Sequence, residues 1–277
     1  PSPADPAGSD AHLWLGWHAG RAGDLGTILR RWPRLGTFLG GIGSQSVNLQ
    51  SWDEQAPTWP GAERGAFNRY LPRRAYGDGR SWARATRSYQ GDLLRVHIET
   101  LRRLKYRPAG GFCVTALTDV APEGGFGVFD VARHPKPALN VLIDACRPVV
   151  VIAEPPPALT VPDQEVSIPV WVVSDRREPL HDVRVTAVAH TNPPDDAASG
   201  NRGEDRPWSR RTVWQGDLPA DCCQWVGDLT FTTPAGPGAI QIDLQLESSE
   251  LLATNRYRTV VIPPSEAIPH GRTSPLR

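Results

Sequence analysis

The spacing of apolar residues changes once along this chain, near Pro148. Before that residue, apolar side chains recur at helical spacing, as in Leu25, Ile28, Leu29 and Trp32. After it they alternate with polar residues, in the runs 166–172, 183–187 and 240–246. Helical spacing predicts amphipathic helices, and alternation predicts strands with one buried face. The 277 residues therefore predict two domains, 1–147 and 148–277, since a domain usually holds about 100 to 200 residues.

The first domain is predicted to alternate helices and strands. The expected elements are a helix at 24–32 that begins at the N-cap Asp24, a strand at 35–42, a helix at 89–104, a strand at 112–117 and a helix at 137–146. Residues 112–117 form a compact apolar run, which is typical of a strand buried on both faces. The connection 48–82 is expected to be a long loop. This alternation predicts parallel strands with crossover helices, as in a (β/α) barrel or a doubly wound sheet.

The second domain is predicted to be all β. Strands are expected at 149–152, 166–172, 183–187, 212–215, 225–232, 240–246 and 256–262. About seven such strands are typical of an immunoglobulin-like β-sandwich, which takes about 100 residues. The stretch 191–211 is polar and rich in Asp, Pro, Gly and Arg, so it is expected to be a mobile hairpin loop without chemistry of its own.

The charge balance excludes several classes of function. The 30 basic residues equal the 30 acidic ones, so no net field draws the chain to nucleic acid or to an anionic membrane. No stretch reaches the ~18 apolar residues of a membrane span. The motifs of dinucleotide, nucleotide, zinc-protease, serine-hydrolase and calcium sites do not occur. We therefore expect a soluble chain, with the cytoplasm favoured, that has no nucleic-acid partner, no membrane partner and no cofactor.

The cysteine and methionine content adds two expectations. The four cysteines lack the CxxC spacing of zinc or redox sites, so structural thiols are expected, with no metal and no disulfide. The adjacent Cys222 and Cys223 should point to opposite faces of one strand. The sequence has no methionine and begins at Pro1, which predicts that the chain is cut or processed from a longer protein.

Four segments of the first domain form a recognisable set. They are HLWLGWHAG from His12, RRWPRLGTFLGGIGSQS from Arg30, SYQGDLLRVHIETLRRLKYRPAGGF from Ser88 and FGVFDVARHPKPA from Phe126. Together they resemble the end of the catalytic barrel in glycoside hydrolase family 2, closest to β-mannosidase-like members, and the second domain resembles the β domain that follows that barrel. The resemblance implies a partial (β/α)8 TIM barrel with the last strands and helices only, because a complete barrel takes about 250 residues.

The resemblance also implies that both catalytic carboxylates are missing. The strand with the family's acid/base glutamate would lie before Pro1, and the family's nucleophilic glutamate, in a Ser-Glu-Phe-Gly motif, aligns with Gly41. Retaining hydrolysis needs two carboxyl groups about 5 to 5.5 Å apart, one as acid and one as nucleophile. Glycine can do neither. Asp53 and Glu54 are expected to be solvated charges of the following loop rather than substitutes.

Six residues are candidates for substrate binding at the expected carboxyl ends of the barrel strands. They are His12, Trp14, Trp17, Gln45, Asp119 and Phe126. The aromatic rings could stack on the apolar face of a sugar, and Phe126 replaces the family's usual tryptophan, which removes an indole donor. The alternative interpretation is that the tryptophans pack against helices and that Gln45 and Asp119 are structural. His97, inside the apolar stripe of a helix, is expected to be a packing histidine.

We expect this chain to be a C-terminal fragment that resembles a β-mannosidase-like glycoside hydrolase. That class hydrolyses O-glycosidic bonds in carbohydrate metabolism. This chain is expected to have no catalytic activity. Its expected partners are a β-mannoside-type carbohydrate and the missing N-terminal part of the same protein. One alternative is a non-catalytic carbohydrate-binding or protein-interaction module. Another is a decayed reading frame that has no function in isolation and aggregates through exposed strand edges.

Overall fold

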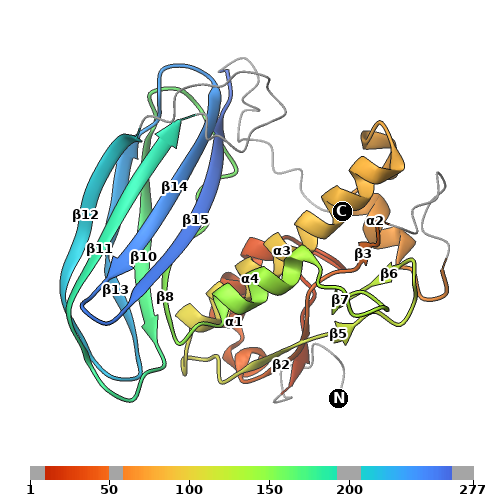
Figure 1. The fold of residues 1–277 in the computed structure, drawn as a ribbon, viewed down its shortest axis with the longest axis horizontal. Helices are drawn as coiled ribbons and strands as arrows, with labels where there is room; N and C mark the ends of the chain where they lie inside the picture. The colour runs from red at the N-terminus through yellow and green to blue at the C-terminus, as the bar shows by residue number, and fades with distance from the viewer. Residues whose placement is uncertain (1–9, 50–58, 192–206, 264–277) are drawn as a thin grey trace. The chain divides into compact units, whose positions relative to one another are not determined.

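The chain divides into two compact units, Pro1–Arg147 and Pro148–Arg277. The computed structural model describes residues 10–49, 59–191 and 207–263 (Figure 1). Helices and short strands build the first unit, and strands alone build the described part of the second.

Short parallel strands form the main sheet of the first unit. β1 (Ala11–His12), β2 (Leu39–Ile42) and β4 (Phe112–Val114) lie in the order β1-β2-β4, with both pairings parallel. β5 (Ala116–Thr118) and β7 (Gly127–Phe129) form a further parallel pair, while β3 (Ser46–Val47) and β6 (Gly124–Gly125) pair antiparallel. The parallel pairing predicted for this half of the chain is confirmed.

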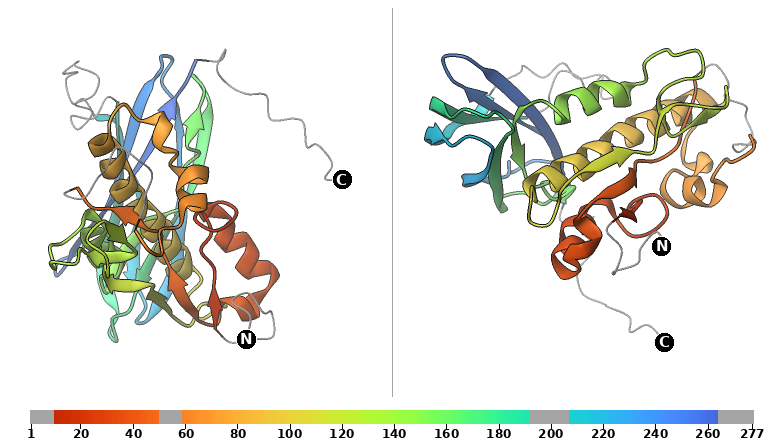
Figure 2. Two further views of the ribbon diagram at one scale, coloured as in Figure 1. Left: turned by 90° about the vertical axis from the view of Figure 1, so that its right-hand side faces the viewer. Right: turned by 90° about the horizontal axis from the view of Figure 1, so that it is seen from below.

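The described part of the first unit contains four α-helices. They are α1 (Leu25–Arg31), α2 (Arg64–Tyr70), α3 (Gly79–Arg103) and α4 (Pro137–Ala145). α4 lies alongside α3 (Figure 2). Arg102, near the end of α3, donates to the carbonyl oxygens of Ala145 at 2.8 Å and Arg147 at 2.6 Å. The apolar stripe of α3, with Leu94 and Ile98, packs into one core with residues of α1, α4 and the parallel sheet.

One strand and one helix begin at residues other than those expected. Residues Pro33–Gly36 form a 3-10 helix, η2, so the strand expected at 35–42 begins only at Leu39. Proline favours this turn because its ring fixes φ at a helical value. α3 begins at Gly79 rather than near residue 89. Asp78 caps this start by accepting a hydrogen bond of 2.7 Å from the Ser81 backbone N–H.

Two segments expected to be uniform are divided. The connection 48–82 contains α2, the 3-10 helix η3 (Arg73–Ala75) and the first residues of α3. The apolar run 112–117 is interrupted between β4 and β5, and its alternate residues Cys113, Thr115 and Leu117 are exposed. It is therefore not buried on both faces, because one face of these strands has no described element over it.

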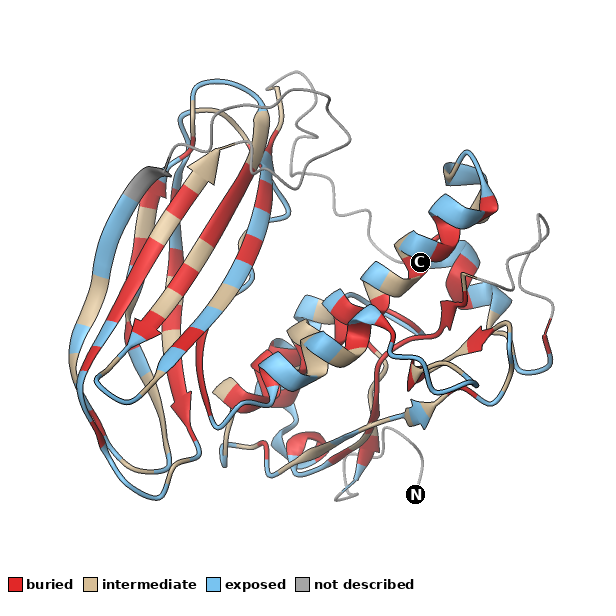
Figure 3. Ribbon diagram, in the orientation of Figure 1, coloured by how far each residue is buried: buried red, intermediate tan, exposed pale blue. Residues whose placement is uncertain are grey.

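The described part of the second unit forms two sheets that share one apolar core. Its strands are β8 (Val149–Ala153), β9 (Leu159–Thr160), β10 (Glu165–Ser174), β11 (Leu180–Thr191), β12 (Pro207–Leu218), β13 (Cys222–Thr232), β14 (Gly238–Glu247) and β15 (Leu252–Val261). The sheet orders are β12-β11-β14-β15-β9 and β13-β10-β8. All these pairings are antiparallel except that of β15 with β9. Alternate residues of both sheets are buried in the common core (Figure 3).

All seven strands expected after Pro148 are present, and the short β9 was missed. Residues 207–211 of the expected loop belong to β12, while 192–206 lie outside the described residues. Cys222 packs against the main core and Cys223 packs with Val150, Ile152 and Val173 in a separate cluster. The two cysteines therefore lie on opposite faces of β13, as their adjacency predicted.

Candidate functional site

The carboxyl ends of β1, β2 and β4 carry the centre of the candidate site. His12 of β1 pairs with Gly41 of β2, and Trp14 follows β1. The indole Nε1 of Trp14 donates to Thr115 Oγ1 at 2.9 Å, and Thr115 Oγ1 donates to the carbonyl oxygen of Ile42 at 2.8 Å. These two hydrogen bonds fix the Trp14 indole at the ends of β2 and β4.

Three further rings surround the Trp14 indole. The ring centroids lie 4.8 Å from it for His18, 5.2 Å for His12 and 6.5 Å for Phe126. All four side chains are partly or fully exposed. We refer to His12, Trp14, His18 and Phe126 as the Trp14 cluster. Exposed aromatic and imidazole rings offer both an apolar face and polar edge atoms, which suits a sugar ring. Three of the six predicted site residues are thus brought together here.

Gly41 lies against the Trp14 cluster. A Cβ atom on this residue would lie 2.9 Å from Cζ2 of Trp14 and 3.0 Å from Nδ1 of His12. Both distances are shorter than normal carbon contacts, so a side chain here would require the two rings to move. The two rings therefore crowd the position that a Cβ atom at residue 41 would take.

Two carboxylates border the Trp14 cluster. Asp10 Oδ2 lies 3.6 Å from His12 Nε2, and Glu63 Oε2 lies 2.9 Å from His18 Nε2. Sequence reasoning missed both Glu63 and His18. Glu63 belongs to the connection that was expected to be a loop, and no spacing relates it to His18. Asp53 and Glu54, which were weighed as substitute acids, lie outside the described residues.

Trp17 and Gln45 do not face the Trp14 cluster. Trp17 is fully buried, packs edge-on against Phe67 with ring centroids 4.9 Å apart, and donates its Nε1–H to Glu63 Oε2. Gln45 is also buried; its Nε2 donates to the Gly61 carbonyl oxygen at 2.9 Å and its Oε1 accepts from the Glu63 backbone N–H at 3.0 Å. Both side chains hold the segment that carries Glu63.

Asp119 lies in a buried polar network beyond the end of β5. Its Oδ2 accepts hydrogen bonds from Lys136 Nζ at 2.7 Å and Asn48 Nδ2 at 3.2 Å, and its Oδ1 accepts from the Gly127 N–H at 2.8 Å. Lys136 also donates to Ser46 Oγ at 3.0 Å. Burial raises the pKa of Asp119 and lowers that of Lys136, while their mutual attraction opposes both shifts. The geometry is that of a structural ion pair.

His97 is buried within α3. Its Nε2 lies 2.9 Å from the carbonyl oxygen of Leu15, so Nε2 carries the proton and donates it. Burial lowers the pKa of His97 to about 4. Nδ1 has no hydrogen-bond partner among the described residues. The imidazole is therefore neutral at pH 7 and joins α3 to the segment between Trp14 and Trp17, a packing role of the kind expected from its place in the helix stripe.

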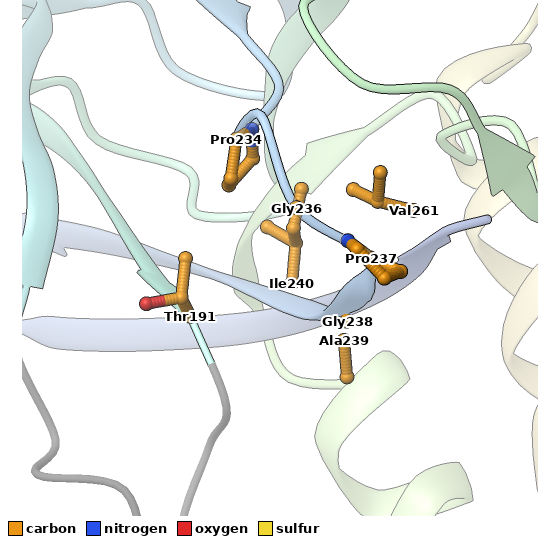
Figure 4. A pocket seen from close by; sticks show the side chains of 8 residues that line it. All are labelled: Thr191, Pro234, Gly236, Pro237, Gly238, Ala239, Ile240 and Val261. Carbon is orange, nitrogen blue, oxygen red and sulfur yellow. The ribbon is translucent and has the colours of Figure 1, made fainter. Parts of the chain in front are cut away.

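The other possible sites among the described residues have few reactive or charged side chains. A cavity of about 220 Å³ at one end of the second unit is lined by Thr191, Pro234, Pro237, Ile240, Val261 and small neighbouring residues (Figure 4), with no titratable side chain among them. Within residues 10–49, 59–191 and 207–263, no three His, Cys, Asp or Glu side chains are grouped so that they could hold a metal ion. No helix in these ranges is long and apolar enough to span a membrane.

The chain matches no protein-family model and no curated protein in sequence. Its fold is similar to that of solved glycoside hydrolases. It superimposes on the β-D-mannosidase of Dictyoglomus thermophilum with a TM-score of 0.65 and 16% identity, covering 91% of this chain and 30% of that chain. It superimposes on the exo-chitosanase of Amycolatopsis orientalis with a TM-score of 0.55 and 12% identity, covering 90% of this chain and 30% of that chain. This chain therefore spans less than a third of either enzyme.

Proposed function

We propose that this chain is part of a β-mannosidase-like protein of glycoside hydrolase family 2. In this proposal the first unit supplies the last strands of a (β/α)8 TIM barrel, and the second is an immunoglobulin-like β-sandwich. The fold likeness to two glycoside hydrolases supports it, as do the parallel order β1-β2-β4 and the two-sheet core. Barrel enzymes have their sites at the carboxyl ends of the strands, which is where the Trp14 cluster lies. Further barrel strands of the same protein would be the partner that closes the sheet.

We further propose that this part of the site binds a β-mannoside-type carbohydrate without hydrolysing it. One observation carries the proposal: His12 and Trp14 pack against Gly41, in the position that the resemblance gives to the nucleophile. A retaining mechanism needs a carboxylate that attacks the anomeric carbon, and residue 41 has no side chain. The rings that fill the space provide a binding surface in place of the nucleophile.

The second candidate function is carbohydrate binding by this chain alone, as a non-catalytic module. The partial exposure of all four rings of the Trp14 cluster favours it, because the described chain already presents the stacking surface to solvent.

Turnover of aryl β-mannosides and related aryl β-glycosides tests the absence of catalysis. We expect no turnover by the wild-type chain. We also expect none by Gly41→Glu, because the Cβ atom of the new side chain would already lie 2.9 Å from the Trp14 indole. A clear rate with the wild-type chain that is lost on substitution near Gly41 would overturn this proposal.

Ligand-observed NMR with methyl β-D-mannopyranoside tests binding. We expect saturable binding by the wild-type chain and its loss in Trp14→Ala. Trp32→Ala is the matched control, because Trp32 is 49% exposed and follows α1, outside the Trp14 cluster. Equal binding by the two variants would place the ligand elsewhere.

A further inference from the structure

The segment that carries Glu63 is held in place by one buried amide. Gln45 is 5% exposed and bonds this segment at two points, the carbonyl oxygen of Gly61 and the backbone N–H of Glu63, at 2.9 and 3.0 Å. Since its oxygen and its nitrogen both bond the segment, Gln45 fixes where the backbone of Glu63 lies. Gln45 precedes β3, a strand whose two residues are fully buried, so the anchor itself is rigid.

The carboxylate of Glu63 is oriented by two donors that bond the same oxygen. Trp17 Nε1 and His18 Nε2 both bond Oε2, and the His18 distance is 2.9 Å. Oε1 accepts no hydrogen bond from the described residues. The side chain of Glu63 is 32% exposed. A carboxylate can accept about four hydrogen bonds, so an oriented oxygen with open lone pairs is available to a ligand.

His18 connects this carboxylate to the aromatic rings. Its ring lies 4.8 Å from that of Trp14 and is exposed. Since Nε2 bonds the Glu63 carboxylate, Nδ1 is the ring nitrogen that is left to bond a ligand. A sugar ring stacked on Trp14 would present its hydroxyl groups at the ring edge. Glu63 and His18 offer two polar groups on that side of the indole, of which the Glu63 carboxylate is an acceptor.

We propose that Glu63 and His18 form the polar edge of the Trp14 cluster, where they recognise hydroxyl groups of an uncharged sugar, with Gln45 as the positioning residue. This inference rests on the proposed sugar binding. Hydrogen bonds from hydroxyl groups to a carboxylate are charge-assisted and stronger than those to a neutral amide. The same charge disfavours a sugar that carries a carboxylate of its own.

The test compares two probes that differ in charge, methyl β-D-mannopyranoside and the corresponding mannosiduronate, by ligand-observed NMR on the full chain. We expect the wild-type chain to bind the neutral sugar more tightly. Glu63→Gln keeps the size of the side chain and an oxygen for Trp17 and His18. We expect this variant to weaken binding of the neutral sugar by about tenfold, the value of one charge-assisted hydrogen bond. We also expect the affinities for the two sugars to become more similar.

Asp217→Asn is the matched control, because His181 and Asp217 form another exposed imidazole–carboxylate pair, at 3.0 Å, in the second unit. It should leave both affinities unchanged. If the wild-type chain binds both sugars equally, or if Glu63→Gln changes neither affinity, the inference is wrong while the sugar-binding proposal stands. If the wild-type chain binds neither sugar, the proposed function fails, and the inference fails with it.

The role of Gln45 needs a readout beyond loss of stability. Gln45→Ala should weaken sugar binding in the wild-type background and have little further effect in the Glu63→Gln background, because Gln45 acts through Glu63. Equal losses of affinity in both backgrounds would show that Gln45 does not act through Glu63. Thermal unfolding of each variant confirms that the chain is folded at the temperature of the titration.

Discussion

The two units of this chain are stabilised by different interactions. In the second, long strands bury alternate apolar residues between two sheets, and the few buried polar residues are uncharged. In the first, strands of two to four residues are joined by helices. Of the residues the structure describes, the buried charged side chains all lie in the first unit: Glu99, Arg102, Asp119 and Lys136.

This difference shows where function can be built. A buried polar group is costly unless it is hydrogen-bonded, and the described core of the second unit holds few of them, such as Tyr257, whose hydroxyl accepts from the Ala153 N–H at 2.9 Å. The first unit uses hydrogen bonds to place Trp14 after β1, Gln45 before β3 and Glu63 before α2. Its stability should therefore depend on polar pairing and on pH, whereas that of the second unit should depend on apolar volume.

The largest effect should come from Lys136→Met. This change leaves the Asp119 carboxylate buried without its cation, and breaking a buried ion pair in this way costs about 4 kcal/mol. Pulse-labelling hydrogen exchange across a urea series measures the loss of unfolding free energy. The exchange is followed separately in peptides of each unit. We expect the loss of unfolding free energy in peptides of the first unit only.

The double variant Lys136→Met with Asp119→Leu should recover part of the stability, because no charge is left unpaired. A loss of less than 1 kcal/mol for the single variant would contradict a structural role for the pair.

The corresponding change in the second unit is Leu244→Ala. Leu244 is fully buried between the sheets, and removing such a side chain costs about 3 kcal/mol through lost burial and the cavity that remains. The same exchange experiment should show the loss in peptides of the second unit. If the first unit lost as much stability, the two units would unfold together and the comparison would not hold.

A more gradual effect should appear on acidification, because only part of it develops in the middle of the pH range. The pKa of His97 is about 4 in the folded chain against 6.5 ordinarily. Between these pH values, His97 binds a proton in the unfolded chain but not in the folded chain. The free energy of unfolding therefore falls as the pH drops from about 6.5 to 4. The full loss is about 3 kcal/mol at about 1.4 kcal/mol per pH unit, reached only at the acid end of the range.

His97→Gln is the control for this prediction, because glutamine can still donate to the Leu15 carbonyl oxygen but does not titrate. Urea unfolding of both chains at a series of pH values measures the difference. The wild-type chain should lose more stability than the variant below pH 6.5. Parallel curves would show that His97 is not the titrating group.

Local patterns predicted much of the fold. The seven expected strands of the second unit are present because alternation fixes which side chains face the core. The stripe of α3 was predicted from Tyr89 to Leu104, but residues 79–88 are mostly polar, so its start at Gly79 was missed. Of the six candidate site residues, the structure brings His12, Trp14 and Phe126 together, whereas Trp17, Gln45 and Asp119 have buried contacts elsewhere. That they bind a ligand stays a prediction.

The sequence by itself determined the change of architecture at Pro148, the alternating strands that follow it, and the glycine at residue 41. These are local properties, since the period of apolar residues and the absence of a side chain do not depend on the path of the chain. Only the tertiary structure decided that Glu63 bonds His18, 45 residues away, and that Asp119 pairs with Lys136. Such pairs form where the fold brings distant segments together, and no spacing along the chain records them.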